Sequence, residues 1–266
     1  MAPDSLAILV SVKFVPMAKI KTILVSQPPP DRENDPYLEL AKKYNLKILF
    51  RKLFMIEGVP SKDFRQDRIN LMDFTAVIFT SKNAIDHYFR ICAEMRVLVP
   101  DTMKYFCVTE SIAYYLQKYV LYRKRKIFHG NQQFSELINV MKKHKNEKFL
   151  LPSSNTIKAE IPKLLEENKY NYKKIIFYRT LPNDLSDIDI HQFDMIVFFS
   201  PAGIRSLFHN FPGFKQNKTL IATFGSTTTH AAKEAGLTLH IQAPSPSAPS
   251  MTMALEQYLG KAAKCK

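Results

Sequence analysis

Serine and threonine residues recur where predicted strands end. Each run follows an apolar, β-branched stretch and precedes a segment with helical periodicity: Thr80-Ser81, Thr109-Glu110-Ser111, Pro152-Ser153-Ser154-Asn155, Ser200-Pro201 and Gly225-Ser226-Thr227-Thr228. The carboxyl ends of strands line the binding crevice of an open α/β sheet, and the next helix offers free N–H groups and the positive end of its dipole. The runs therefore indicate an anion-binding site, although such residues also serve simply as N-caps.

Two further residues belong to this pattern. Gly225 allows a tight turn or the close approach of a ligand. Tyr178 ends a predicted strand in the run Phe177-Tyr178-Arg179-Thr180. Its side chain either packs against its neighbours or offers a phenol to the crevice, and the sequence leaves both interpretations open.

The sequence lacks the motifs of several common catalytic sites. It contains no G-x-G-x-x-G, no G-x-x-x-x-G-K-[ST], no G-x-S-x-G and no H-E-x-x-H. With seven glycines in all, the chain is poorly suited to cradle a dinucleotide phosphate with its backbone. The seven histidines are dispersed without metal-ligand spacing, and we expect them at the surface or at helix ends. We therefore predict neither a metal site nor a cofactor.

The elements that must position these residues alternate along the chain. Ten short apolar runs are predicted strands: residues 21–25, 47–50, 76–80, 105–108, 126–128, 149–151, 174–178, 195–199, 220–224 and 238–241. Most precede a predicted helix: residues 35–44, 83–93, 111–119, 133–142, 156–167, 203–208, 227–235 and 251–259. Several runs are apolar throughout, as in parallel strands covered on both faces. The pattern predicts an α/β protein with two open parallel sheets, since ten strands are many for one.

An internal repeat also predicts two related domains. Residues 74–89 and 193–208 align without a gap at an offset of 119, with Ser81 matching Ser200. Both segments read as a buried strand, a short turn and a helix. A second strand and helix follow each serine after another 25 to 28 residues. Coincidental similarity between buried strands is the alternative explanation.

Composition and charge restrict the class of protein. The 266 residues are 46% hydrophobic, which excludes a disordered chain, and no apolar run approaches the roughly 20 residues of a membrane span. Net charge is +14, and residues 104–180 hold 16 basic and 6 acidic side chains. This excess indicates either solvated faces and loop edges or attraction to a polyanionic ligand. Cys92, Cys107 and Cys265 are too few and too separated for a disulfide scaffold, which fits a reducing cytoplasm. We take Met17 as a natural start and residues 1–16 as an extension.

At these motifs the sequence resembles the uroporphyrinogen-III synthase family. The resemblance runs from about residue 20 to residue 259 and rests on the order and spacing of its motifs: Phe79-Thr80-Ser81-Lys82-Asn83-Ala84, Leu151-Pro152-Ser153 through Tyr178-Arg179-Thr180, Phe198-Phe199-Ser200-Pro201-Ala202-Gly203, and the segment from Gly225 to Leu237. It implies two flavodoxin-like α/β domains joined by two extended linkers. Residues 20–53 and 182–260 would form one domain and residues 60–175 the other. Residues 54–59 and 176–181 would be the linkers, and residues 1–19 and 261–266 flexible termini.

The resemblance also implies an activity. The family's substrate is hydroxymethylbilane, a linear tetrapyrrole with eight carboxylates, which loses its terminal hydroxyl and closes with inversion of ring D through a spirocyclic intermediate. Without the enzyme the bilane closes to the type I isomer. Catalysis would then depend on orientation and electrostatics, which fits a chain without a triad or metal site. The implied protein is a cytoplasmic, monomeric lyase of haem biosynthesis that meets the upstream deaminase transiently.

The family's functional residues carry over by position. Tyr178 matches the tyrosine proposed to assist departure of the hydroxyl. The positions implied to bind substrate are Ser81, Lys82, Asn83, Thr109, Ser153, Ser154, Ser200, Pro201, Ala202, Gly203, Gly225, Ser226, Thr227 and Thr228. Ser226 stands where many members have proline, and Lys82-Asn83 where some have Pro-Arg.

Two other functions remain open at this point. A non-catalytic two-domain protein that closes on a small polyanion would use the same turns. A nucleic-acid-binding protein would use the basic segment 104–180, but no zinc finger or aromatic RNA motif accompanies it. We therefore expect neither nucleic acid nor a membrane as partner.

Overall fold

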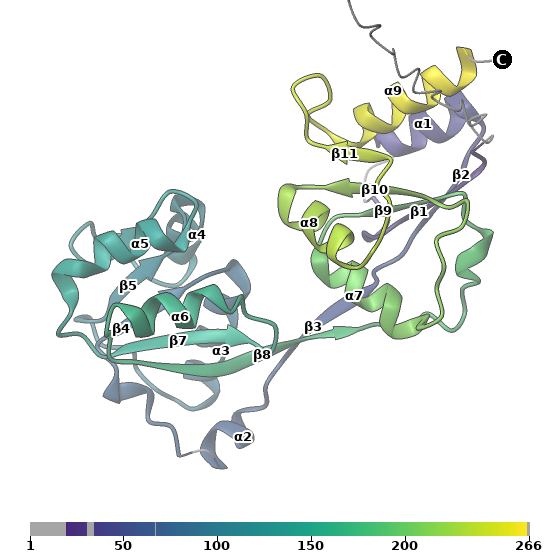
Figure 1. Cartoon of the computed structure of the whole chain (residues 1–266). Coiled ribbons are helices and arrows are strands. Elements are labelled where there is room, and N and C mark those ends of the chain that lie inside the picture. The colour runs from purple at the N-terminus through teal and green to yellow at the C-terminus, as the bar shows by residue number, and fades with distance from the viewer. Residues whose placement is uncertain (1–19, 31–34, 67, 265–266) are drawn as a thin grey trace, which may run out of the picture. The chain divides into compact units, whose positions relative to one another are not determined.

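The computed structural model describes residues 20–30, 35–66 and 68–264. The predictions for Met17, for residues 1–16 and for Cys265 lie outside these residues. The chain divides into two compact units (Figure 1). The first unit contains the described residues up to Leu53 and those from Pro182 onwards, and the second unit is Phe54–Leu181. No described helix is long and apolar enough to cross a bilayer.

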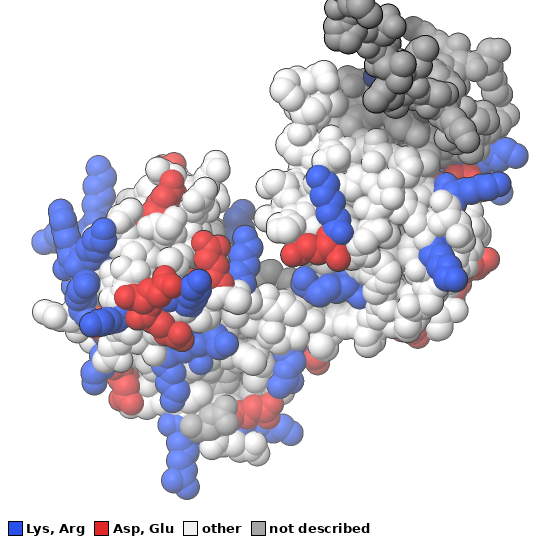
Figure 2. All heavy atoms as spheres, viewed as in Figure 1, with Lys and Arg blue, Asp and Glu red and all other residues white. Residues whose placement is uncertain are grey.

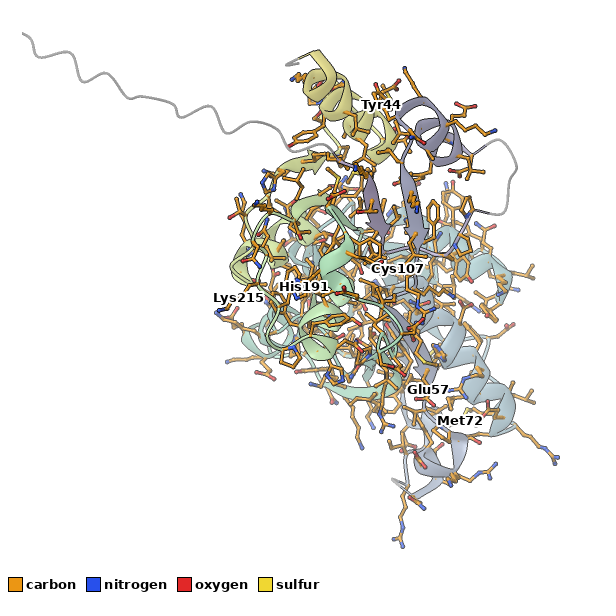
Figure 3. All side chains as sticks on the ribbon, turned by 90° about the vertical axis from the view of Figure 1, so that its right-hand side faces the viewer. Tyr44, Glu57, Met72, Cys107, His191 and Lys215 are labelled. Atoms are coloured by element: carbon orange, nitrogen blue, oxygen red, sulfur yellow. The ribbon has the colours of Figure 1, made fainter. Side chains whose placement is uncertain are left out.

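The first unit is a five-stranded parallel sheet with helices on both faces (Figure 1). The strand order is β11-β10-β9-β1-β2. The strands are β1 (Thr22–Val25), β2 (Lys47–Phe50), β9 (Met195–Phe198), β10 (Leu220–Phe224) and β11 (Ile241–Ala243), and the helices are α1 (Pro36–Tyr44), α7 (Pro201–Asn210), α8 (Ser226–Glu234) and α9 (Met251–Lys264). Tyr44, at the end of α1, lies beside α9 (Figure 3).

The second unit is a six-stranded sheet of order β3-β8-β7-β4-β5-β6, in which β8, β7, β4, β5 and β6 are parallel. Its strands are β3 (Phe54–Gly58), β4 (Ala76–Phe79), β5 (Lys104–Cys107), β6 (Ile127–His129), β7 (Phe149–Ser154) and β8 (Tyr172–Pro182). Its helices are α2 (Ser61–Gln66), α3 (Lys82–Glu94), α4 (Glu110–Tyr115), α5 (Phe134–Met141) and α6 (Glu160–Glu167). The predicted α/β class with two parallel sheets is confirmed.

The central strands are apolar throughout because both of their faces are covered. In β4, Val77 and Phe79 pack into a cluster with α3, whereas Ala76 and Ile78 pack into a second cluster with α5 and α6. All four are fully buried. The same alternation in the first unit sends Val197 of β9 toward α1 and α9, and Ile196 and Phe198 toward α7 and α8. Each sheet therefore has two hydrophobic layers, and its carboxyl edge is left for polar residues.

The repeat seen in the sequence is a structural repeat. Residues 74–89 form β4 and most of α3, and residues 193–208 form β9 and most of α7. In the second unit β4 lies between β7 and β5, and in the first unit β9 lies between β1 and β10. In both sheets one neighbour, β5 or β10, is the next strand along the chain. The two units thus use the same local topology.

The structure differs from the predictions mainly at the edges of the sheets. Strand β3 and helix α2 were not predicted. The last predicted strand, residues 238–241, lies too early in the chain, since only Ile241 belongs to β11. Helix α4 is six residues long and continues as a 3₁₀ turn over Leu116–Lys118. Edge elements have short or mixed patterns because one side of an edge strand faces solvent, so their periodicity is weak.

Candidate functional site

A polar cavity of about 620 Å³ lies at the carboxyl edge of the second unit's sheet. Its walls come from the loops after β4, β5, β6 and β7 and from β8. The lining residues are Thr80, Val108, Thr109, Ile112, Gln132, Gln133, Phe134, Ser154, Thr156, Ile157, Lys158, Glu160, Ile161 and Tyr178. Three predicted site residues, Thr109, Ser154 and Tyr178, meet in this cavity.

A register shift in the sheet brings Tyr178 to the cavity. Strand β8 pairs with β7 residue by residue up to Ser153, which lies opposite Ile176, but Ser154 lies opposite Tyr178. The extra residue on β8 makes a bulge, which interrupts the alternation of inward and outward side chains. As a result Phe177 and Tyr178 are both buried although they are consecutive. Phe177 packs against Phe64 in the core, whereas the ring of Tyr178 reaches the cavity.

Two side chains, one capping α3 and one within it, contact Tyr178. The Tyr178 hydroxyl lies 3.0 Å from the Ser81 hydroxyl. The His87 imidazole stacks on the phenol ring, with ring centroids 5.0 Å apart and planes 17° from parallel. Burial raises the pKa of Tyr178, and hydrogen bonding with Ser81 and Ser154 partly opposes this rise. The phenol is therefore protonated at neutral pH and is available as a proton donor.

Ser81 has a structural task as well as its contact with Tyr178. It is the N-cap of α3, and its hydroxyl accepts a hydrogen bond of 3.1 Å from the amide of Ala84. Lys82 is exposed, and its ammonium group lies 5.3 Å from the centroid of the Tyr115 ring. Asn83 is half-buried in the first turn of the helix. Of these three predicted residues, Ser81 alone directly contacts the phenol.

The other predicted residues of this unit have different surroundings. Thr109 is the N-cap of α4 and accepts a hydrogen bond of 3.3 Å from the amide of Ile112. Ser153 is buried and donates a hydrogen bond of 3.0 Å to the carbonyl of Ile175, which ties β7 to β8. The Ser154 hydroxyl accepts from the amide of Thr156 at 3.2 Å and lines the cavity. Ser153 therefore supports the sheet, and Ser154 faces the site.

The first unit has a second depression at the end of β10. Its volume is about 760 Å³, and it is lined by Phe224, Gly225, Ser226, Thr229, His230, Lys233, Gln242, Ala243 and Pro244. Gly225 has φ +87° and ψ 146°, a conformation that side chains other than glycine rarely adopt, and a Cβ there would meet no atom within 4 Å. The glycine is needed for its backbone conformation and not for lack of space.

The threonines of α8 divide between the core and the surface. Thr227 is exposed, Thr228 is 1% exposed, and Thr229 lines the depression. The Thr229 hydroxyl lies 2.9 Å from that of Thr223 on β10. Ser226 begins the first turn of the helix and also lines the depression. The structure thus brings together Gly225, Ser226 and Thr229 at this surface, and Thr229 was not predicted.

The turn from β9 to α7 repeats the geometry of Ser81. Ser200 is the N-cap of α7, and its hydroxyl accepts a hydrogen bond of 3.3 Å from the amide of Gly203. Pro201 occupies the first turn, where its missing N–H has no helical partner to lose. Ala202 is half-buried and Gly203 is buried. The turn stands at the same carboxyl edge as Gly225 because β9 and β10 are parallel neighbours.

Comparison of the sequence with models of known protein families shows which family the chain belongs to. The model of the family described as uroporphyrinogen-III synthase HemD matches residues 36–253, most of the chain. The chain belongs to the uroporphyrinogen-III synthase HemD family. No curated protein sequence matches it significantly.

Solved structures of HemD-type synthases share the fold. A mutant uroporphyrinogen III synthase from the extremely thermophilic bacterium Thermus thermophilus is 14% identical, with a TM-score of 0.64 over 92% of this chain and 100% of that chain. The uroporphyrinogen-III synthetase from Helicobacter pylori 26695 is 18% identical, with a TM-score of 0.56 over 91% of this chain and 100% of that chain. At these identities the likeness concerns the fold alone.

Sequence reasoning missed several cavity residues of this HemD-family chain. Gln132 and Gln133 follow β6, so the same rule of polar residues at strand ends would have found them. Lys158 enters the cavity from the loop between β7 and α6, a segment that was predicted to be the start of a helix, whereas α6 begins only at Glu160. His87 was expected at the surface or a helix end, yet it lies within α3 against Tyr178. His87 is half-buried, and its contact with Tyr178 could not be predicted because it joins residues 91 positions apart in the chain.

Not every backbone amide at the cavity is free to bind an anion. The side chain of Glu136 accepts hydrogen bonds from three consecutive amides, those of Asn131, Gln132 and Gln133, at 3.1, 2.8 and 3.1 Å. These three amides belong to the loop and the N-cap that precede α5, and Glu136 lies in the first turn of that helix. A carboxylate of the chain itself therefore occupies these backbone donors.

The described part of this HemD-family chain holds no group of three or more metal-ligating side chains. Cys92 and Cys107 are free and buried. Burial raises the pKa of Cys92 to about 11 and that of Cys107 to about 12, so both are neutral thiols at physiological pH. Neither is suited to act as a nucleophile, because a thiolate is the reactive form.

Proposed function

We propose that this chain is a uroporphyrinogen-III synthase. It would convert hydroxymethylbilane to uroporphyrinogen III by dehydrative cyclisation with inversion of ring D, and would thus be a cyclising hydro-lyase. Membership of the HemD family carries the proposal. The second unit supports it with a protonated phenol at the edge of a polar cavity.

In this proposal Tyr178 assists the departure of the hydroxyl. The phenol donates its proton to the hydroxymethyl oxygen, the C–O bond breaks, and water leaves with the bonding electron pair. The bilane becomes a cation that its own pyrrole nitrogens stabilise. The substituted carbon of ring D then attacks to form the spirocycle, which opens and recloses in the inverted orientation. The final pyrrole loses a proton on closure, and that proton restores the phenol.

The chain's main contribution would be to select a conformation. Hydroxymethylbilane closes without a catalyst, so the protein needs to favour one closure over another. Lys158 in the cavity offers positive charge to a carboxylate arm, and Thr109 and Ser154 offer hydroxyl groups. On the first unit, Lys233 and Ser226 beside Gly225 offer the same kinds of group. Charge and hydrogen bonding together suit a substrate with eight carboxylates.

We also propose the finer properties that the family resemblance suggested. The domains would be residues 20–53 with 182–260 and residues 60–175, with linkers at 54–59 and 176–181. The protein would work as a monomer in the cytoplasm, where its buried thiols stay reduced. It would meet the upstream deaminase only transiently. Light scattering on the eluting protein tests the monomer, and sedimentation of an equimolar mixture with the deaminase tests a lasting complex.

The direct test is a coupled assay of the isomer formed. Hydroxymethylbilane is generated in situ by its deaminase, the protein is added, and the oxidised uroporphyrins are separated by chromatography. Mostly type III product is the expected result, and samples without the protein should give type I. Type I alone, from protein that circular dichroism shows to be folded, would reject the proposal.

A further inference from the structure

Helix α3 and its cap contact the Tyr178 phenol at two points. Ser81, the N-cap, lies 3.0 Å from the hydroxyl, and His87, six residues later, stacks on the ring. One contact restricts the direction of the hydroxyl, and the other restricts the plane of the ring. Such a pair of contacts leaves the phenol few orientations.

The hydrogen bonds of Ser81 define which way its proton points. Its oxygen already accepts from the amide of Ala84. When Tyr178 gives its proton to a leaving group, its own O–H must point to the substrate, so Ser81 is the donor in the contact between the two hydroxyls. The phenol oxygen then accepts from Ser81, which stabilises the negative charge that develops as the proton leaves.

The imidazole of His87 is itself held by its neighbour. Arg90 donates from Nε to Nδ1 of His87 at 3.3 Å, which assigns the imidazole proton to Nε2. The same guanidinium donates to Glu94 at 2.6 Å and to the carbonyl of Val59 at 2.7 Å. With three partners, Arg90 is a fixed support. Burial and the charge of Arg90 lower the pKa of His87, so its ring is neutral against the phenol.

We propose that Ser81 and His87 are positioning residues for Tyr178, and that they hold the phenol so that its proton is directed at the departing hydroxyl. The inference rests on the proposed function for its consequence in turnover. The contacts that orient the phenol all lie within the second unit and exist without substrate. The orientation can therefore be tested both with and without substrate.

The test without substrate uses nuclear magnetic resonance of ring-¹³C-labelled tyrosine. The Tyr178 signal is identified by its loss in Tyr178→Phe. His87→Leu should move this signal because the ring current of the stacked imidazole is lost, and Ser81→Ala should move the Cζ signal because a hydrogen bond is lost. His87→Phe should restore the shielding, and His209→Leu, an exposed histidine on α7, should change nothing. A Tyr178 signal unmoved by His87→Leu and Ser81→Ala in the folded protein would overturn the proposal.

The test with substrate is a double-mutant cycle. His87→Leu should lower kcat for type III product by on the order of tenfold, since small misplacements of a reacting group are costly. In the Tyr178→Phe background the same change should have no effect, because the proton that His87 helps to direct is gone. His87→Phe should recover most of the wild-type kcat. An equal loss in both backgrounds would mean that His87 acts on the fold or on the substrate, and would overturn its positioning role.

The two proposals fail in different ways. If the wild-type protein forms no type III product, the proposed function fails, and the resonance experiment still decides whether α3 orients the phenol. If type III product forms but the Tyr178 signal and the cycle show no coupling, the synthase stands and the positioning role falls.

Discussion

The two units carry the same turn with different chemistry around it. Ser81 and Ser200 have nearly the same backbone angles, with φ −159° and ψ 163° in one and φ −156° and ψ 154° in the other. Both hydroxyls cap the third amide of the helix that follows. Ser81 also meets a phenol from β8, two strands away in the sheet. The strand in the same position of the first unit, β2, ends at Phe50, which packs edge-on against Tyr37.

The next pair of turns, before α4 and before α8, differs in how the helix begins. Thr109 begins α4 with a side-chain cap, whereas Gly225 begins α8 with a positive φ and no side chain. The second unit therefore presents hydroxyl and phenol groups fixed by side-chain contacts. The first unit presents a backbone conformation that depends on one glycine. The repeated fold supplies a common edge, and the neighbouring strands decide what chemistry that edge can perform.

The largest effect should come from the phenol that only the second unit has at this place. Tyr178→Phe should lower the rate of type III formation by about 10²-fold, the lower end of what a positioned proton donor contributes. The matched control is Tyr170→Phe, which removes another largely buried hydroxyl of this unit, one that donates to the carbonyl of Ile138. The control should lose some stability and keep its turnover. Equal turnover of the two variants would show that the Tyr178 phenol has no part in the reaction, and the proposed functional difference between the units would be lost.

The first unit should be sensitive to a change of backbone at Gly225. Gly225→Ala should destabilise the protein by about 1–3 kcal/mol, because a Cβ is strained at φ +87° even though space is available. Gly213→Ala, also in open space but without a positive φ, is the control. Urea unfolding measures both. A Gly225→Ala protein as stable as the control would show that the turn does not need its glycine.

Replacing the two capping serines should have similar effects on stability but different effects on Tyr178. Ser81→Ala and Ser200→Ala should each cost about 1 kcal/mol of stability, because each removes an N-cap of similar geometry. Only Ser81→Ala should change the resonance of Tyr178. Denaturation curves and the labelled-tyrosine spectrum measure the two effects. A clear difference in stability would mean that the contact with the phenol also supports the fold.

The smallest difference between the two units should be in how their stability falls with pH. Burial tends to raise the pKa of Asp86, but hydrogen bonds from Tyr119 and Tyr115 and the charge of Lys118 bring it below its usual value. Burial likewise tends to raise the pKa of Glu147, and hydrogen bonds from Lys104 and Thr75 outweigh it. A lowered carboxyl pKa adds stability above the unfolded-state pKa of about 4, and this stability is lost as the pH falls through the folded value.

Both partly buried carboxyls lie in the second unit, so that unit should lose protection first as the pH falls below about 4. Hydrogen exchange followed by mass spectrometry resolves the peptides of each unit. Asp86→Asn should reduce the pH dependence in the second unit, and the exposed Asp187→Asn is the control. Loss of protection in the first unit before the second would contradict the prediction.

Much of the fold could be predicted because its signals are local. The buried strands at residues 76–79 and 195–198 are apolar on both faces, and Ser81 and Ser200 are placed by the same N-cap rule. The polar edge of each sheet follows from where its strands end. Strand β3 has no such signal, since it is short, largely exposed and contains Glu57. The predictions failed where an element's identity depends on its partner.

The site could be predicted only in part. Tyr178 was singled out as a strand-end residue, and the family resemblance gave it a role, but its orientation follows from the bulge opposite Ser154. Thr228 and Thr229 are adjacent threonines of one helix, and only their packing decides which is buried. Periodicity marks a helix well but places its polar face less exactly when the face is short.

The sequence by itself determined the alternation of strands and helices, the polar ends of the strands and the excess of positive charge, which gathers on the second unit (Figure 2). These properties depend on residues within a few positions of one another. The contact of His87 and Ser81 with Tyr178 was decided only by the tertiary structure. It joins segments more than 90 residues apart, and its geometry depends on a one-residue shift between two strands, which no local pattern encodes.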